Sequence, residues 1–175
     1  MKHLLSFILC TLFILTSCKK ETTIIKTPDD KTISTFYFIR HAEKDRTDIT
    51  NKNPKLNEKG LLRAEKWSQV FKNVAFDAIY STNYHRTKLT AAPTAKQNNL
   101  EVIIYNSNAI DINKFLKENA GKNVLVVGHS NSTPSFVNKI LKNKTYKQID
   151  DNNNANLYTV TVFNDTIISN LLFIK

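Results

Sequence analysis

Short apolar runs alternate with segments of helical spacing along most of this chain. Continuous runs rich in β-branched or aromatic residues occupy 36–39, 78–80, 100–105 and 124–127. Between these runs, helices are expected over 56–73, 84–97, 111–117 and 134–141. Continuous apolar runs are typical of strands that helices cover on both faces. The alternation therefore predicts an α/β fold, a three-layer sandwich with a mostly parallel sheet and helices on both faces.

Several residues mark the ends of these expected helices. Asn57 is expected to cap the first helix, and Asp111 could cap the third, which Gly121 would close. Pro93 lies inside the second helix. Because proline lacks the N–H group that a helix interior uses, we expect Pro93 to kink or shorten that helix.

The C-terminal part of the chain reads differently. Two strand-like segments, near 157–163 and 166–174, are separated by Asn164 and Asp165. Asn and Asp tolerate the backbone conformations of tight turns, so the pattern predicts an antiparallel hairpin. We expect this hairpin at one side of the parallel sheet.

The N-terminal residues resemble a targeting segment. Lys2 and His3 precede an apolar run over 4–15, which is shorter than the roughly 20 residues of a membrane-spanning helix. Residues 15–18, Leu-Thr-Ser-Cys, resemble the lipobox of bacterial lipoproteins. This resemblance implies cleavage before Cys18 and lipidation of Cys18. The alternative is an ordinary signal peptide with an incidental cysteine.

The predicted organisation is a lipoprotein signal peptide over 1–17, a polar tether over 18–32 and one domain over 33–175. The location that follows is the bacterial cell envelope, with the protein anchored to the membrane outside the cytoplasm. Cys10 would leave with the signal peptide. The domain would then have no thiol for a disulfide or a metal site, and no histidine spacing suggests a metal site either.

The chain is basic, with 25 Lys and Arg against 15 Asp and Glu and a net charge of +10. Such an excess suits an anionic membrane, nucleic acid or anionic small molecules. The lysines are scattered, and no nucleic-acid-binding motif or sustained basic run is present. We therefore expect a solvated basic surface and no nucleic acid partner.

Reactive side chains follow three of the expected parallel strands. Arg40 and His41 come after the first strand, Ser81 after the second and His129 after the fourth, while Arg86 lies near the start of the second helix. The carboxyl ends of parallel strands meet at one edge of the sheet, so these groups can converge. Helix N-termini near Arg86 and Ser132 would add amide donors and positive potential. Cations, imidazoles and helix ends predict a pocket for phosphate.

These motifs resemble those of the histidine phosphatase superfamily, which is also called phosphoglycerate mutase-like. The resemblance lies in residues 40–43 (Arg-His-Ala-Glu), residues 81–87 with Thr90 and Ala91, and residues 128–130 (Gly-His-Ser). Residues 56–60, followed by Arg63 and Ala64, resemble the helix-opening signature of that family. The motifs occur in the order of the family and cover about 36–141. The short length is similar to small bacterial members without a large cap.

The resemblance implies roles for the site residues. His41 would attack phosphorus and form a phosphohistidine that water then hydrolyses. Arg40, Arg86 and His129 would bind the phosphoryl oxygens, and His129 would be protonated beside a dianion. Ser81 and Glu43 are further candidates for substrate binding. No metal or other cofactor is required.

The proton donor for the leaving group is open at this stage. In many relatives a carboxylate after the third strand has this role, and Asp111 has a comparable place, although an N-cap explains Asp111 equally well. The acid of the acid phosphatase branch, directly after the second histidine, is replaced by Ser130.

The predicted function is a phosphomonoesterase that acts on small phosphorylated compounds. A location outside the cytoplasm disfavours a glycolytic mutase. One alternative is a phosphohistidine or phosphoprotein phosphatase with an open pocket. Another is a lipoprotein that binds phosphate or other anions without catalysis.

Overall fold

The computed structural model describes residues 32–175, which form a six-stranded sheet with four helices. The strands are β1 (Ile33–Arg40), β2 (Ala78–Ser81), β3 (Val102–Ile104), β4 (Asn123–Gly128), β5 (Asn156–Phe163) and β6 (Thr166–Phe173). The helices are α1 (Glu58–Val70), α2 (His85–Gln97), α3 (Ile112–Glu118) and α4 (Ser132–Leu141). The predicted signal peptide, Cys18 and nearly all of the predicted tether lie outside the described residues.

The strand order is β3-β2-β4-β1-β5-β6. The first four strands of this order are parallel, whereas β5 runs antiparallel to β1 and pairs with β6 as a hairpin. Asn164, with φ 52°, makes the turn of this hairpin. The predicted fold class is confirmed, including the hairpin at one side of the parallel strands.

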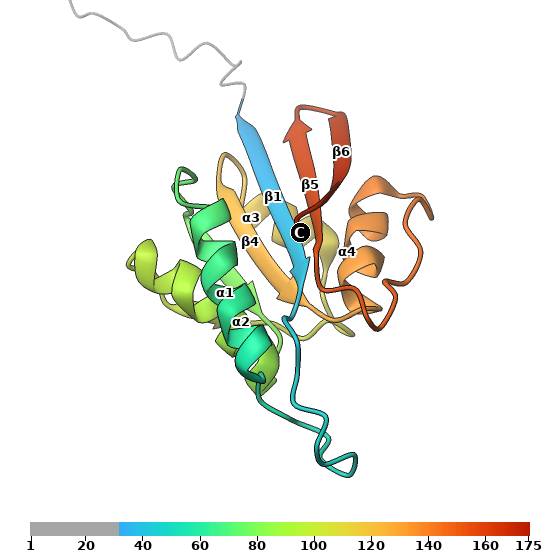
Figure 1. Cartoon of the computed structure of the whole chain (residues 1–175). Coiled ribbons are helices and arrows are strands. Elements are labelled where there is room, and N and C mark those ends of the chain that lie inside the picture. The colour runs from blue at the N-terminus through green and yellow to red at the C-terminus, as the bar shows by residue number, and fades with distance from the viewer. Residues whose placement is uncertain (1–31) are drawn as a thin grey trace, which may run out of the picture. The chain divides into compact units, whose positions relative to one another are not determined.

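Each face of the sheet has its own hydrophobic core. Helices α1 and α2 pack on one face through residues such as Trp67 and Ala91, while α3 and α4 pack on the other through Phe115 and Phe136. Figure 1 shows α1 and α2 on one side of β1 and α4 on the other. The continuous apolar runs of β1 and β4 supply both cores, since successive side chains point to opposite faces.

Pro93 does not end its helix, because α2 continues to Gln97. Of the two expected effects of Pro93, the shortening is therefore wrong, and the kink stays a prediction. Proline removes a single hydrogen bond of the helix, and the next turn is held by the burial of Thr94 and Ala95. Tertiary packing outweighs the local disadvantage here.

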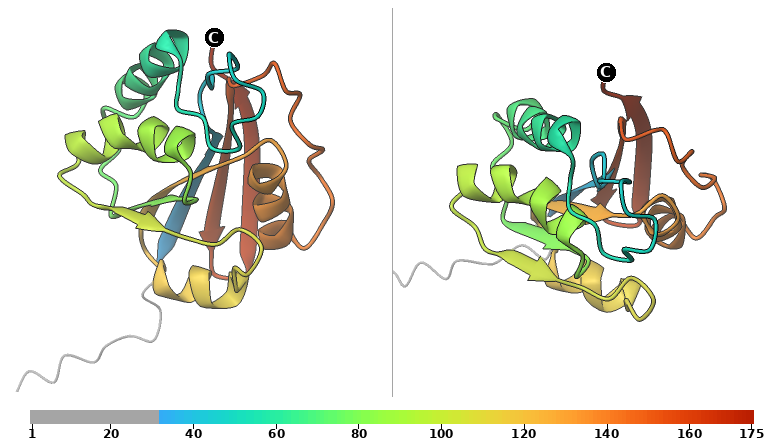
Figure 2. Two further views of the ribbon diagram at one scale, coloured as in Figure 1. Left: turned by 90° about the horizontal axis from the view of Figure 1, so that it is seen from below. Right: turned by 60° about the horizontal axis from the view of Figure 1, so that its bottom comes forward.

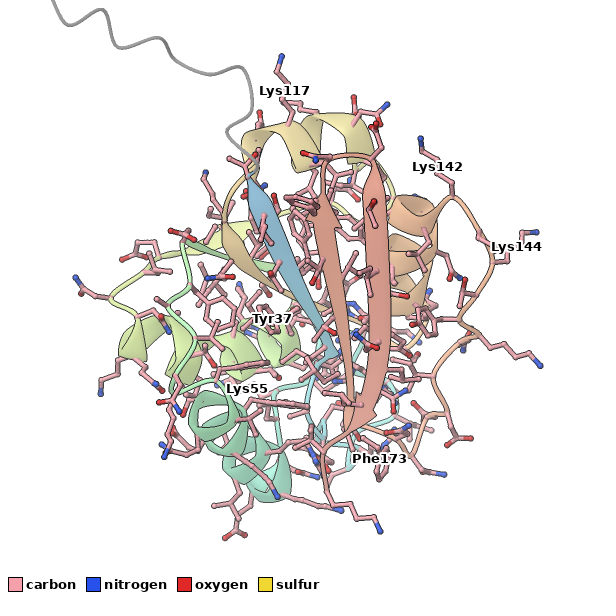
Figure 3. The ribbon with its side chains drawn as sticks, turned by 90° about the horizontal axis from the view of Figure 1, so that it is seen from above. Tyr37, Lys55, Lys117, Lys142, Lys144 and Phe173 are labelled. Atoms are coloured by element: carbon pink, nitrogen blue, oxygen red, sulfur yellow. The ribbon has the colours of Figure 1, made fainter. Side chains whose placement is uncertain are left out.

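The third strand is shorter than the apolar run over 100–105 suggested. It lies at the edge of the sheet and pairs only with β2, and Ile103 and Ile104 are exposed. The opposite edge is β6, where Phe173 is exposed as well (Figure 3). Within residues 32–175 no helix has the length and apolar character that a membrane span requires.

Candidate active site

The predicted reactive residues lie at the carboxyl edge of the parallel strands. Arg40 ends β1 and lies beside Gly128, the last residue of β4, while Ser81 ends β2 beside Val127. The view from below in Figure 2 looks onto this edge, where the loop after β1 crosses in front of the sheet. The ring centroids of His41 and His129 are 5.4 Å apart. The structure thus brings both histidines to one place.

His41 is held in one tautomer. It is 3% exposed, and its Nδ1 lies 2.7 Å from the carbonyl oxygen of Ala42. A carbonyl can only accept, so Nδ1 carries the proton and Nε2 keeps the lone pair. Burial, opposed by the bond to Ala42 and assisted by the nearby cations, lowers the pKa of His41 to about 3. The ring is therefore neutral near pH 7 and can attack through Nε2.

The backbone around His41 is fixed by side chains from distant segments. Asn154 donates to the carbonyl of His41 at 2.8 Å, and the amide of Ala42 donates to Thr90 Oγ1 at 2.9 Å. Gly60 lies against Glu43, where an added Cβ would be 2.1 Å from the Glu43 carbonyl oxygen. The glycine lets the start of α1 press directly on the segment that follows His41.

Arg40 is tied to the loop before β5. Its guanidinium donates to the carbonyls of Asp150, Asp151 and Asn153 at 2.8 to 3.0 Å and to the carboxylate of Asp151 at 2.7 Å. Its Nε is buried without a hydrogen-bond acceptor. Most donors of Arg40 are thus used to fix its position, and Nε is left for a ligand.

Arg86, in contrast to Arg40, has most of its buried donors free. It lies in the first turn of α2, with its guanidinium carbon 4.4 Å from the centre of the Tyr84 ring. Its Nε and Nη1 are buried without acceptors. Burial lowers the pKa of Arg86, but an arginine stays charged. A cation above an aromatic ring with free donors is ready to bind an anion.

His129 is positioned by a short chain of hydroxyl groups. Its Nδ1 lies 3.4 Å from Thr82 Oγ1, and the Thr82 hydroxyl donates to Thr87. Because that hydroxyl proton is used, Thr82 can accept from Nδ1 and Nε2 faces away with no partner. Burial and the cations of Arg86, Arg40 and Lys44 lower the pKa of His129 to about 4. The free site thus keeps His129 neutral, and the protonated form expected from the sequence requires the charge of a bound anion.

Unpartnered buried polar atoms gather at this site. Seven such side-chain atoms occur among the described residues, and four of them belong to Arg40, Arg86 and His129. Three of the four are arginine donors, and a buried donor without an acceptor costs about 1–3 kcal/mol, so their concentration marks a place where a ligand completes the hydrogen bonding. Nitrogen donors and cations define that ligand as an anion.

Three predicted site residues make other contacts. Ser81 is fully buried, and its hydroxyl donates to the Thr82 carbonyl. Burial opposes ionisation of Glu43, but hydrogen bonds from Arg63 prevail and hold the pKa of Glu43 below its usual range. Asp111 accepts from the amide of Lys114 as the N-cap of α3. The exposed His85 bonds through its backbone to Asn53.

Several positioning residues were not singled out from the sequence. Asp151 and Asn154 lie in a loop more than 100 positions after Arg40 and His41, and nothing local marks their contact. In the sequence Thr90 stands out only as part of a motif. Its helical spacing from Arg86, to whose carbonyl it donates, was a signal that both residues face the site.

Two cavities flank the paired histidines. One, of about 460 Å³, is lined by Tyr84, Arg86, His129 and Lys139 among others. The second, of about 360 Å³, is lined by Arg40, His41, Glu43 and Asp151 among others. No cluster of metal-binding side chains occurs within residues 32–175. Donors and positive charge surround the space between the cavities, which suits a phosphoryl group.

Comparison with known proteins agrees with this geometry. The model of the histidine phosphatase superfamily (branch 1) matches residues 36–107, which include Arg40, His41 and Arg86. No curated protein matches the chain at a significant level.

Solved structures show the same fold. A phosphoglycerate mutase from Bacillus anthracis str. Sterne has a TM-score of 0.64 at 14% identity, covering 83% of this chain and 95% of that one. A mycobacterial glucosyl-3-phosphoglycerate phosphatase, in complex with VO3, gives 0.64 at 13% identity, with coverages of 81% and 100%. A phosphoserine phosphatase from Entamoeba histolytica, in complex with 3-phosphoglyceric acid, gives 0.57 at 17% identity, with coverages of 78% and 97%.

The fold and the site define an α/β protein of the phosphoglycerate mutase-like type with an anion pocket at the carboxyl edge of its sheet. Over residues 36–107, which carry its first motifs, the chain is similar to the histidine phosphatase superfamily.

Proposed function

We propose that this hydrolytic phosphatase is a phosphomonoesterase that releases phosphate from small phosphorylated compounds through a phosphohistidine on His41. The observation that carries the proposal is the set of unpartnered buried donors on Arg40 and Arg86, with the unpartnered Nε2 of His129, beside a neutral, buried His41. Donors without acceptors suit phosphoryl oxygens, and a free imidazole nitrogen suits attack on phosphorus.

The first step transfers the phosphoryl group to the enzyme. A bond forms between Nε2 of His41 and phosphorus while the ester P–O bond breaks, and the leaving oxygen takes up a proton. Nδ1 stays bonded to the Ala42 carbonyl, which stabilises the ring as it becomes positive. In the second step water attacks phosphorus, the N–P bond breaks and phosphate leaves with His41 neutral again.

Arg86, His129 and the free Nε of Arg40 would stabilise the charge on the transferring group. The arginine donors are fixed before the substrate arrives, so little reorganisation opposes the reaction. A bound dianion raises the pKa of His129 from its low value in the free site. Protonation of Nε2 then supplies one further charged hydrogen bond.

The proton donor for the leaving group is the least developed part of the site. The carboxylate of Asp111 caps α3 and lines neither cavity beside the histidines. Glu43, which does line one, is paired with Arg63. The proposed enzyme would therefore favour esters with good leaving groups, which need little protonation.

Hydrolysis of 4-nitrophenyl phosphate by the full chain tests the proposal. We expect the release of nitrophenol, and a fall in kcat on the order of 10³-fold or more in His41→Ala. His85→Ala is the matched control, because His85 is exposed and its side chain makes no hydrogen bond within the described residues. Binding of phosphate without turnover in the unaltered chain would instead establish an anion-binding protein.

Quenching in alkaline denaturant during turnover tests the intermediate. Labelled phosphate should remain on the unaltered chain as an acid-labile, alkali-stable adduct and be absent from His41→Ala. An enzyme that turns over without such an adduct would refute the covalent route.

The cellular location also enters the proposal. The lipobox-like residues 15–18 favour a lipid anchor on Cys18, so the substrate would be met in the cell envelope. Labelling with radioactive palmitate, compared between the unaltered chain and Cys18→Ala, tests the anchor. Equal labelling of both chains would overturn it.

A further inference from the structure

A further cavity lies next to the site and is lined by lysines. It has a volume of about 670 Å³, and Lys139, Lys142, Lys144 and Lys147 contribute to its wall. We name these four residues and the cavity between them the lysine cleft. Asn131, Ser135 and Lys139 line both the lysine cleft and the cavity beside Arg86 and His129. The two spaces are therefore neighbours along α4.

The charged side chains that line these two cavities are all basic. None of the described residues that line either of these two cavities is acidic. The four lysines also make no ion pair with a described carboxylate. The four positive charges lie close together and repel one another. A polyanion bound there would be attracted by all four and would also offset their mutual repulsion.

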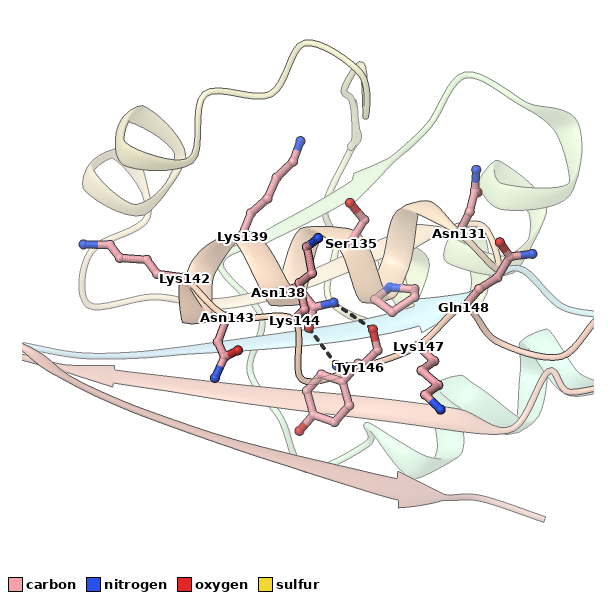
Figure 4. A pocket seen from close by; sticks show the side chains of 11 residues that line it. Asn131, Ser135, Asn138, Lys139, Lys142, Asn143, Lys144, Tyr146, Lys147 and Gln148 are labelled. Atoms are coloured by element: carbon pink, nitrogen blue, oxygen red, sulfur yellow. Dashed lines mark hydrogen bonds between the residues drawn. The ribbon is translucent and has the colours of Figure 1, made fainter.

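The backbone that carries the lysines is fixed. The Asn138 side chain donates to the Tyr146 carbonyl at 2.7 Å and accepts from the Tyr146 amide at 2.8 Å (Figure 4). The amide of Ile149 donates to the Ser130 carbonyl, one residue from His129. The loop after α4 thus returns to the active site, and hydrogen bonds fix it at Tyr146 and at Ile149.

The lysine side chains spread along the cleft. In Figure 4 they point in different directions from α4 and the following loop and do not meet at one point. A single phosphate would be held by converging donors, whereas spread charges suit an anion with several separate groups. Lys139 lies about 10 Å along the helix from its first residue, and its side chain leans back toward that end. Lys139 is thus the lysine best placed for a second anionic group.

We infer that the substrate is a phosphomonoester whose leaving group carries further phosphate or carboxylate groups, held by the lysine cleft while the ester lies between His41 and His129. This inference rests on the proposed phosphatase function and names its substrate class.

Matched substrates test the inference. Fructose 1,6-bisphosphate and fructose 6-phosphate differ by one phosphate, and we expect kcat/KM of the full chain to be about tenfold higher for the bisphosphate, beyond the twofold statistical factor. In Lys139→Gln this preference should fall about fivefold, and further in the triple variant with Lys144→Gln and Lys147→Gln. Raising the NaCl concentration should weaken the preference of the unaltered chain more than that of the triple variant.

Lys117→Gln is the control. Lys117 is an exposed lysine in the last turn of α3, as Lys139 is in the last turn of α4, and it lines neither cavity. Figure 3 shows Lys117 on α3, away from Lys142 and Lys144. Its substitution removes the same charge and should leave the preference unchanged. If Lys117→Gln and Lys139→Gln lower the preference for the bisphosphate equally, the effect comes from net charge alone. That result would refute binding of the substrate by the lysine cleft.

A binding measurement separates the two proposals. Calorimetric titration of fructose 1,6-bisphosphate into the His41→Ala chain, with and without the three lysine substitutions, needs no turnover. Weaker binding in the triple variant would support the cleft even if 4-nitrophenyl phosphate were not hydrolysed. Hydrolysis of 4-nitrophenyl phosphate together with unchanged binding and preference in the triple variant would refute the cleft and leave the phosphatase intact.

Discussion

The two halves of the active site are built in opposite ways. On the side of β1, Arg40 and His41 are almost fully buried and most of their polar atoms are bonded to the protein. On the side of α2 and β4, Arg86 and His129 have buried nitrogens without partners. One half is thus completed by the protein and holds His41, the proposed nucleophile, in place, whereas the other is completed only by the ligand.

The two arginines give the largest expected contrast. Arg86→Ala should lower kcat/KM for 4-nitrophenyl phosphate on the order of 10²–10³-fold without loss of stability, since it removes donors that the fold leaves unpaired. Arg40→Ala should lower activity as well, and also the free energy of unfolding by about 3 kcal/mol, because three carbonyls lose their donor. Steady-state kinetics and urea unfolding measure both. Equal destabilisation by the two substitutions would contradict the contrast.

Lowering the pH should reduce the free energy of unfolding of the ligand-free protein, because of both active-site histidines. Their folded-state pKa values, about 3 for His41 and about 4 for His129, lie below the ordinary value of 6.5. The unfolded chain therefore takes up protons as the pH falls from about 6.5, while the folded chain does not. Each histidine lowers the free energy of unfolding by up to about 1.4 kcal/mol per pH unit in this range, less for the partly exposed His129.

Urea unfolding between pH 7 and 4.5 measures this effect. His41→Gln should flatten the curve more than His129→Gln does. Added phosphate should also raise stability, since it binds the folded state alone. A curve that is flat in the unaltered chain would show that the two rings are not kept neutral.

A substitution at Gly60 in α1 tests the half of the site that contains Arg40 and His41. Gly60→Ala places a methyl group against the Glu43 carbonyl and should cost about 1–3 kcal/mol of stability, with reduced activity because the segment after His41 must move. Gly121→Ala is the control, since Gly121 has φ +75° but an added Cβ would make only ordinary van der Waals contact with Thr32, at 3.5 Å. It should cost about 1 kcal/mol and leave kcat unchanged. Thermal unfolding and nitrophenyl phosphate kinetics distinguish the two variants.

Asp111→Asn should have the smallest effect. Asparagine caps a helix about as well as aspartate, so stability should change little. The ratio of rates for aryl and alkyl phosphates should stay within about twofold. A selective loss of alkyl phosphate hydrolysis would instead make Asp111 the acid of the leaving group.

The sequence was sufficient for the parts of this site that depend on local pattern. The runs of β1 and β4 predicted buried strands, and parallel strands necessarily present their carboxyl ends at one edge, so Arg40, His41 and His129 could be placed together. Asn57 and Asp111 were predicted as caps from their position alone, and both accept the expected backbone hydrogen bonds.

Contacts between distant segments could not be predicted in this way. The bonds of Arg40 to the loop at 150–153 depend on where the chain returns after α4, and no periodicity encodes that return. The same holds for the lysine cleft, whose residues appear in the sequence as scattered charges. Pro93 shows the reverse case, in which a strong local rule gives way to burial of the following turn.

The hydrogen bond from His41 Nδ1 to the Ala42 carbonyl has a consequence for the product of the first step. It blocks one ring nitrogen and leaves the other, so the proposed intermediate can exist as a single positional isomer, phosphorylated at Nε2. Nuclear magnetic resonance distinguishes the two isomers by the coupling of phosphorus to the ring protons. One backbone carbonyl thus determines the regiochemistry of the enzyme.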